Sequence, residues 1–265
     1  MNPYLPIRKV PLDYNGISSS AFAVQMQHSA GKDTPNSEWK EVGVVGNSYM
    51  LLPNEEVKNA AHQVAEECKI DFVHDKTFFN GRNFVYSMKS SHVAGEVKEG
   101  DDVALGMQFW NSYDGSKAFG FAMMLYRLIC TNGMMSKDHF NTYRFKHEPK
   151  SENWEENLEQ VVANINSLVA GSSKLDSLLH SFRRLSKSHV TTEELGRIRH
   201  NHLQEIPVSI WGQIVDRFTR GTKEDYSGWD LLNASTDLLW HKEKPTITTY
   251  GQNATIVDGL CRAVA

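Results

Sequence analysis

In residues 117–131, both the odd-numbered and the even-numbered positions are largely apolar. One face carries Phe119, Phe121 and Met123, and the other carries Ala122 and Met124. Successive side chains of a β-strand point to opposite sides of the sheet. A strand that is apolar on both sides is therefore expected at the centre of a sheet that is covered on both faces.

Two turn dipeptides predict that this sheet is mainly antiparallel. Each of them, Asn80-Gly81 and Asp114-Gly115, separates two strand-like runs. Such dipeptides favour tight hairpins because the central residues of the turn adopt positive φ. The predicted hairpins join residues 72–79 to 84–88 and residues 103–110 to 117–131.

Helical signals come once before these hairpins and dominate after residue 150. A helix is expected over 54–69, with the Asn54 side chain as its cap. A further helix is predicted to begin at Ser151, and Thr191 with Glu194 has the pattern of a capping box. The last helix is expected over 227–240.

These elements predict an α+β fold, with a mainly antiparallel sheet followed by a helical C-terminal half. We expect a loop-rich N-terminal arm at 1–40, a sheet-containing core at 41–150, and a helical region at 151–265 packed on the core. The arm carries apolar residues such as Tyr4 and Ile7 without a clear period. It is expected either to pack on its own domain or to clasp a neighbouring copy of the chain.

Composition and motifs exclude several functional classes. The chain has 265 residues and a formal net charge of -4, and 40% of its residues are hydrophobic. It carries no nucleotide-binding, nucleophile-elbow or zinc-ligand motif, and we expect neither a cofactor nor a bound metal. No run reaches the roughly 18 apolar residues of a membrane span, so a cytoplasmic protein without membrane contact is expected.

Arg127 stands in the otherwise apolar run, three positions before Cys130. A buried guanidinium requires carboxylate or carbonyl partners. Arg127 is therefore expected either to tie the sheet to a loop or to contact an anion at the end of the sheet. An enzyme with its site near Arg127 and Cys130 is the least favoured of the functions considered.

Basic residues concentrate in two stretches, 137–150 and 174–202, although the net charge of the chain is negative. Aromatic residues lie between the basic residues of the first stretch. Cationic tracks beside aromatic rings are typical of proteins that hold single-stranded nucleic acid, through phosphate neutralisation and base stacking. A solvated helix face is the alternative interpretation of the same pattern.

Several motifs resemble the DUF932 family of phage- and plasmid-type proteins. The matching pieces are Gly46-Asn47-Ser48-Tyr49 through Asn54-Glu55, Asn80-Gly81-Arg82, Trp110-Asn111-Ser112-Tyr113-Asp114-Gly115-Ser116, Arg127-Leu128-Ile129-Cys130-Thr131-Asn132-Gly133 and Asn233-Ala234-Ser235-Thr236. The resemblance spans roughly residues 40–240 and implies a mobile-element origin in a bacterial host, but no established activity. The order of elements is also similar, in topology alone, to ring-forming single-strand annealing proteins.

The leading hypothesis is a phage-type recombination protein that binds and anneals single-stranded DNA as a homo-oligomer, in a ring or a filament. The alternative is a non-enzymatic interaction or host-takeover factor. The residues expected to hold phosphates are Arg82, Lys117, Arg144, Lys146, Arg183, Arg184, Lys187, Arg197 and Arg199. The residues expected to stack on bases are Phe79, Trp110 and Tyr113.

Overall fold

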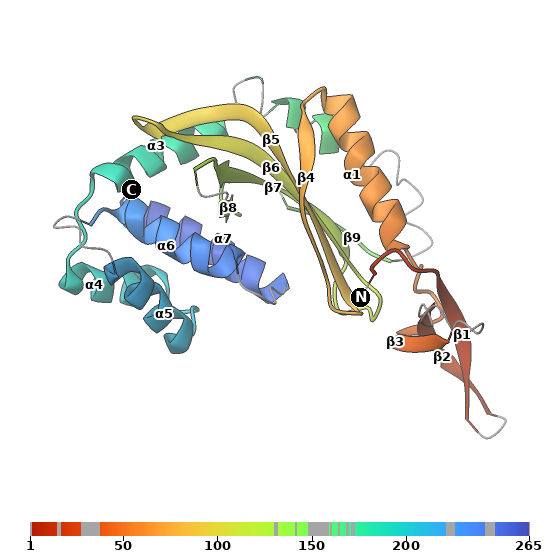
Figure 1. Cartoon of the computed structure of the whole chain (residues 1–265). Coiled ribbons are helices and arrows are strands. Elements are labelled where there is room, and N and C mark those ends of the chain that lie inside the picture. Colours follow the sequence, from red (N-terminus) through yellow and green to blue (C-terminus); the bar gives the residue numbers. More distant parts are fainter. Residues whose placement is uncertain are drawn as a thin grey trace, which may run out of the picture.

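The computed structural model describes residues 2–14, 17–27, 38–129, 132–140, 142–147, 159, 161–163, 165–167, 170, 173–220, 226–241 and 247–264. The fold is α+β, as the sequence predicts. A small antiparallel sheet precedes a large one, and helices dominate the C-terminal half (Figure 1).

The N-terminal segment is not the irregular arm that the sequence suggests. It forms strands β1 (Ile7–Tyr14) and β2 (Ile17–Gln27), which join β3 (Trp39–Gly46) in an antiparallel sheet of order β1-β2-β3. Val24 and Met26 are fully buried in a cluster that also contains Tyr113 of the main body. The described strands of this segment therefore pack on their own chain, which is the first of the two expected arrangements.

The large sheet has the strand order β4-β5-β6-β7-β8, and β9 pairs with the free part of β7. Its strands are β4 (Phe72–Phe79), β5 (Asn83–Lys98), β6 (Asp101–Ser112), β7 (Phe119–Arg127), β8 (Asn132–Met135) and β9 (Thr142–Phe145). Both predicted hairpins are present, and Gly81 and Gly115 have positive φ angles of 94° and 70°. All described pairings are antiparallel.

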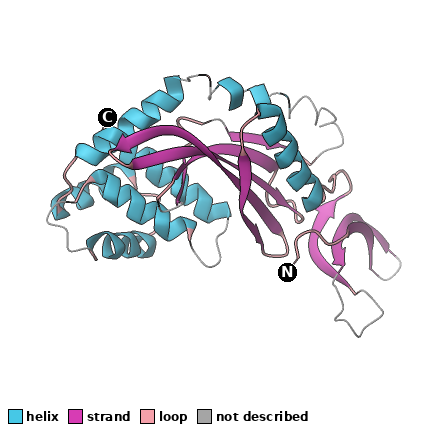
Figure 2. Ribbon diagram, turned by 45° about the horizontal axis from the view of Figure 1, so that its top comes forward, coloured by secondary structure: helices cyan, strands magenta, loops and turns pink. Residues whose placement is uncertain are grey.

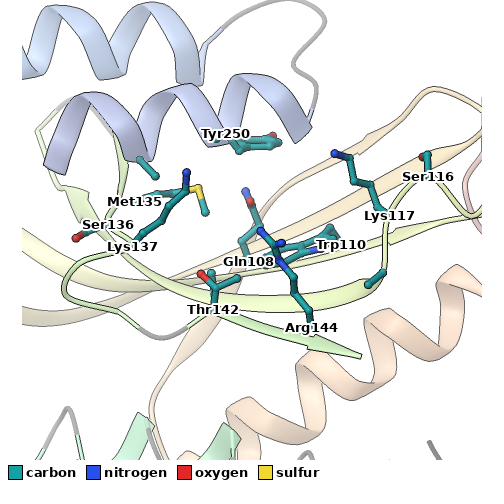
Figure 3. Close-up of a pocket in the computed structure, with 14 residues that line it drawn as sticks. Gln108, Trp110, Ser116, Lys117, Met135, Ser136, Lys137, Thr142, Arg144 and Tyr250 are labelled. Atoms are coloured by element: carbon teal, nitrogen blue, oxygen red, sulfur yellow. The ribbon is translucent and has the colours of Figure 1, made fainter. Parts of the chain in front are cut away.

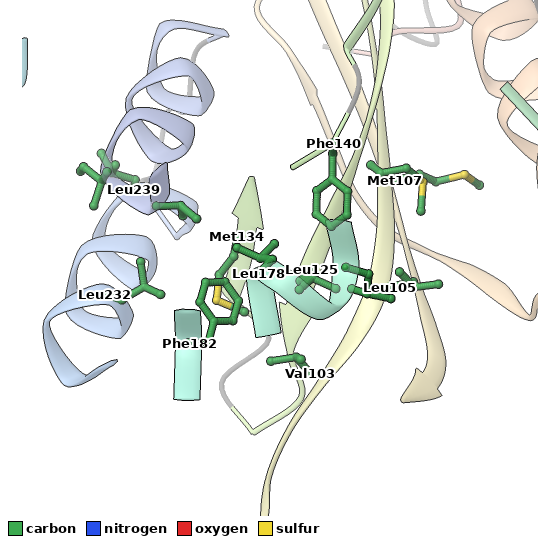
Figure 4. Packing of buried hydrophobic residues seen from close by; sticks show 14 of the residues in the cluster. Val103, Leu105, Met107, Leu125, Met134, Phe140, Leu178, Phe182, Leu232 and Leu239 are labelled. Carbon is green, nitrogen blue, oxygen red and sulfur yellow. The ribbon is translucent and has the colours of Figure 1, made fainter. Parts of the chain in front are cut away.

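Strand β7 is buried on both faces, as its sequence predicts. Phe121, Met123 and Leu125 belong to the main core, together with residues of α1 (Asn54–Cys68) and α3 (Ser173–Lys187). Figure 4 shows this side of the sheet, with Leu125 beside Leu105 and Leu178. Met124 and Tyr126 lie on the opposite face. They form a second apolar cluster there with Trp240 and Tyr250.

The start of α1 corrects the prediction that Asn54 caps this helix. Pro53 occupies the cap position, and no side chain caps the helix there. The Asn54 side chain is buried instead, where its Nδ2 donates to the carbonyl oxygen of Pro3 and its Oδ1 accepts from Asn111. Asn54 therefore fastens the N-terminal segment to the large sheet.

The C-terminal half contains α3, α4 (Thr192–His202), α5 (Val208–Thr219), α6 (Gly228–Trp240) and α7 (Ile247–Ala263). The Thr191–Glu194 capping box is present as predicted, whereas most of the helix expected from Ser151 lies outside the described residues. Helix α7 follows the helix that we expected to be the last. It packs beside α6. Figure 2 shows most of the helices to the left of the curved sheet and one long helix to its right, which Figure 1 labels α1.

Candidate nucleic-acid interface

An open pocket of about 290 Å³ lies between α7 and the large sheet (Figure 3). It is on the face of the sheet that carries Met124 and Tyr126, beside the first turns of α7. Strands β6, β7, β8 and β9 contribute its floor and sides, and Tyr250 of α7 lies above them. The lining residues are Gln108, Trp110, Ser116, Lys117, Ala118, Ala122, Met135, Ser136, Lys137, Thr142, Arg144, Tyr250, Gly251 and Ala254.

Strand register brings the floor residues together from distant parts of the sequence. Trp110 in β6 is directly opposite Gly120 in β7, and Gly120 is directly opposite Arg144 in β9. The next row on the same face contains Gln108, Ala122 and Thr142. Cross-strand neighbours on one face lie about 5 Å apart, so these two rows place an aromatic ring, an amide and a guanidinium side by side.

Gly120 makes the close approach of Trp110 possible. A Cβ atom at position 120 would lie 2.1 Å from the Trp110 ring, so no larger residue fits without displacing the indole. Trp110 is 9% exposed and lines the pocket. The small residue therefore lets the indole ring lie over the neighbouring strand, in the direction of Arg144.

Three cations line the pocket, Lys117, Lys137 and Arg144, and all three are exposed. No aspartate or glutamate is among the described lining residues, and in the described part of the chain none of the three cations forms an ion pair. The pocket therefore has a local positive charge in a chain whose formal net charge is negative.

Local structure explains why these cations are available to a ligand. On β9, Thr142 and Arg144 are exposed, whereas the alternate residues Tyr143 and Phe145 pack against the main core. Lys117 ends the β6–β7 turn, where its N–H donates to Ser112 Oγ at 3.1 Å and its carbonyl accepts from the same hydroxyl at 2.8 Å. The backbone of Lys117 is fixed while its side chain reaches solvent.

The pocket therefore contains three of the predicted residues, Trp110, Lys117 and Arg144. Lys146 directly follows β9, the strand of Arg144, and is also exposed. Arg82 lies exposed in the β4–β5 turn, and its carbonyl accepts a hydrogen bond from the N–H of Tyr113.

Two of the predicted stacking residues lie in the packed junction between the sheets. Tyr113 is 1% exposed, and its hydroxyl accepts a hydrogen bond from the N–H of Asn54. Phe79 is half-buried and meets Tyr113 edge to face. A ring enclosed like that of Tyr113 has no free face for a base, so the candidate interface does not include it.

The remaining predicted basic residues lie on α3 and α4, away from this pocket. Arg183 Nε donates to the carbonyl of Glu96, Arg199 donates to the carbonyl of Ile206, and Arg197 pairs with Glu193 at 2.8 Å. Arg184 and Lys187 are exposed on α3. Neither helix lines the pocket, and we refer to these five residues together as the second basic surface.

Arg127 ties the sheet to a helix. Its guanidinium binds both carboxylate oxygens of Asp101 at 2.7 Å, and Trp229 Nε1 of α6 donates to the same carboxylate at 2.9 Å. Burial by itself would raise the pKa of Asp101, but the hydrogen bonds from Arg127 and Trp229 and the charge of Arg127 hold it below its ordinary value. This geometry agrees with the structural interpretation of Arg127. Cys130 lies outside the described residues.

The sequence analysis did not select Lys137, Gln108 or Tyr250 as site residues. Lys137 belongs to the first basic stretch, so charge alone could have identified it. Gln108 is the one polar residue between Val103 and Trp110, and Tyr250 lies in a helix that was not predicted. Among the described residues there is no cluster of metal-ligand side chains, and no described helix is long and apolar enough to cross a membrane.

Comparisons with known proteins identify a family. Neither the search of curated proteins nor the search of solved structures found a match. One family model matches residues 41–260, and its description is "Domain of unknown function (DUF932)". The match covers the large sheet, the described helices up to residue 260 of α7, and every residue that lines the pocket. The chain therefore belongs to the DUF932 family.

Proposed function

We propose that this protein binds single-stranded DNA and that the pocket between the large sheet and α7 is where the strand makes its main contacts. The observation that supports this proposal most is the meeting of Trp110, Lys117 and Arg144 in one open pocket that no described acidic side chain lines. These three residues are candidates from the sequence alone. Trp110 and Lys117 come from the β6–β7 hairpin, and Arg144 comes from β9.

The chemistry of the pocket suits a nucleotide unit. Lysine and arginine neutralise phosphates, and an aromatic ring stacks on a base of any identity. The volume of about 290 Å³ lies at the lower end of the range for small-molecule sites, which fits one nucleotide better than a folded strand. Arg82 and Lys146 are proposed to contact phosphates on either side of that nucleotide.

Annealing of complementary strands by a homo-oligomer remains part of the proposal. Several protomers would align many weak strand contacts along one path, which raises the overall affinity without new contacts in any single protomer. In this arrangement Arg183, Arg184, Lys187, Arg197 and Arg199 of α3 and α4 would contact DNA that passes between protomers. Light scattering with and without single-stranded DNA measures the particle mass, and a monomer in both states would contradict this part of the proposal.

The binding proposal is tested by fluorescence anisotropy with a labelled single strand of about 20 nucleotides, longer than one site of this class. Five phosphate contacts, from the three pocket cations with Arg82 and Lys146, give a log–log salt slope of about -3.5, since each contributes about 0.7 on a single strand. Lys117→Ala and Arg144→Ala should each weaken binding and make the slope shallower by about 0.7.

Lys40→Ala is the matched control, because Lys40 is an exposed lysine of β3 outside both basic surfaces. This variant removes the same charge and should bind like the wild type. Arg184→Ala with Lys187→Ala tests the α3 surface separately. A salt-independent wild type, or an effect of Lys40→Ala equal to that of Arg144→Ala, would contradict a site in the pocket.

A further inference from the structure

A chain of buried polar side chains runs beneath the pocket. Gln108 Nε2 donates to Ser87 Oγ at 3.2 Å, Ser87 hydrogen-bonds to Tyr126, and the Tyr126 hydroxyl donates to Asp75 Oδ2 at 3.1 Å. Gln108, Ser87 and Tyr126 are each at most 1% exposed. The Tyr126 ring reaches this position because it lies over Gly106, where a Cβ atom would be 2.2 Å from the ring.

The direction of every hydrogen bond in this chain follows from its last member. The Asp75 carboxylate, which pairs with Lys89 at 3.3 Å, only accepts hydrogen bonds, so the Tyr126 hydroxyl must donate its single proton to it. Burial, followed by the charge of Asp75, raises the pKa of Tyr126, which keeps that proton in place. Tyr126 can then only accept from Ser87, and Ser87 can only accept from Gln108.

The donor-to-acceptor direction of these hydrogen bonds fixes the orientation of the Gln108 amide. Its nitrogen must be the atom that faces Ser87, which leaves Oε1 and the second N–H for other partners. In the described part of the chain, Oε1 accepts no hydrogen bond and is not among the fully enclosed atoms. Figure 3 shows the amide group pointing from the sheet toward Tyr250, next to Trp110.

A second unsatisfied polar atom lies across the pocket, on α7. Tyr250 is 3% exposed, and its hydroxyl has no hydrogen-bond partner among the described residues. Buried polar groups in folded proteins are nearly always paired, so such an atom points to a missing partner. The Tyr250 hydroxyl is enclosed, so of these two groups it is the Gln108 amide that is open to the pocket.

We propose that Gln108 reads the polar edge of a nucleobase that stacks on Trp110, and that Tyr126 and Ser87 are positioning residues that hold the amide in one orientation. This inference rests on the proposed binding of single-stranded DNA. It adds base preference to that function, because a fixed amide presents one acceptor and one donor in a set order. Base edges that match this order bind more tightly than edges that do not.

The test compares the dissociation constants of the full-length protein for oligo-dA, oligo-dC and oligo-dT with those for an abasic strand and for inorganic polyphosphate. The wild type should bind its best homopolymer at least about fivefold more tightly than its worst, the lower limit for one specific base contact. Gln108→Leu should reduce this ratio toward one while polyphosphate binding stays unchanged. Trp110→Ala should weaken binding of all three homopolymers.

Tyr126→Phe tests the positioning role, because it removes one hydroxyl and lets the amide turn over. It should lower the ratio of dissociation constants between the worst and the best homopolymer and leave polyphosphate affinity intact. A general loss of structure would lower the polyphosphate affinity as well. Ser87→Ala is the second variant if Tyr126→Phe does not fold. Tyr86→Phe is the matched control, because its hydroxyl bonds His62 on the opposite face of the sheet, and it should keep the ratio.

The outcomes separate the two proposals. If neither DNA nor polyphosphate binds, the proposed function fails and the inference fails with it. If DNA binds with equal affinity for all three homopolymers, or if Gln108→Leu keeps the full ratio, binding stands and base reading by Gln108 is overturned.

Discussion

Asn253 of α7 completes the outer edge of β8 by pairing with the backbone at Met135. Its Oδ1 accepts from the Met135 N–H at 3.0 Å, and its Nδ2 donates to the carbonyl of Gly133 at 2.9 Å. A side-chain amide thus takes the place of the next strand. Exposed sheet edges readily pair with other chains, and this contact covers one.

Asn253→Ala should destabilise the protein by about 1–3 kcal/mol, because it leaves two backbone groups of β8 without their partner. It should also weaken DNA binding, since Met135 and Tyr250 on either side of this contact line the pocket. Urea unfolding and anisotropy measure the two effects. Gln252→Ala, at the neighbouring half-buried position, is the control and should change neither.

Gly120→Ala should move Trp110 and weaken single-strand binding. The added methyl group would overlap the indole, and overpacking of this kind costs about 1–3 kcal/mol of stability. Gly46→Ala is the control, because a Cβ atom at Gly46 meets no atom within 4 Å. Tryptophan fluorescence and anisotropy should both change for Gly120→Ala and stay unchanged for Gly46→Ala. Unaltered binding with a displaced indole would argue against stacking on Trp110.

Asp101→Asn should lower the free energy of unfolding at neutral pH by about 3 kcal/mol, because it removes the charge of a buried carboxylate that binds the Arg127 guanidinium through both oxygens. The pKa of Asp101 is lowered in the folded state, so its contribution is present above its ordinary value of 3.8 and is lost as the pH falls through the folded value. The difference between wild type and variant should therefore shrink as the pH falls below 3.8. A constant difference across this range would contradict the assignment.

His147 should make the protein less stable in mild acid. It stacks on Tyr49 with ring centroids 4.5 Å apart, its Nδ1 is 3.0 Å from the carbonyl oxygen of Met50, and its Nε2 is buried without a partner among the described residues. Burial lowers the pKa of His147 below its ordinary value of 6.5. The unfolded chain therefore binds the proton first, and stability falls as the pH drops below about 6.5.

His147→Gln should reduce this pH dependence. Urea unfolding at about pH 8 and about pH 5.5 measures it as the change in the free energy of unfolding. Burial also lowers the pKa of His139, which adds to the trend in both proteins, so the comparison between wild type and variant isolates His147. An equal loss of stability in the two proteins would assign the effect to other groups.

Local signals predicted the parts of the fold that depend on neighbouring residues. The turns at Gly81 and Gly115 and the capping box at Thr191 are determined within a few positions of the chain. Helix α7 was missed because β-branched residues and two glycines lower its intrinsic helix propensity. Its burial of Ile256, Val257 and Leu260 outweighs that preference.

The candidate site was only partly predictable because register, rather than composition, assembles it. Trp110 and Arg144 become neighbours only through the pairing of both flanking strands with Gly120, which no local pattern indicates. The N-terminal strands were likewise missed. Their pairing depends on contacts between Val24 and residues of β3 and the main body, and serines and prolines obscure their alternation.

The division of one edge of the large sheet between β8 and β9 limits how copies of this chain can assemble. Strand β7 pairs with β8 at residues 124–127 and with β9 at residues 119–122, so two short strands share an edge that a single long strand would otherwise occupy. A neighbouring molecule finds no uninterrupted template there, and Asn253 already occupies part of β8. A ring or filament built by pairing β-strands of neighbouring copies would therefore have to grow from the β4 side or from the N-terminal sheet. Growth from either place would leave the mouth of the pocket accessible to a passing DNA strand.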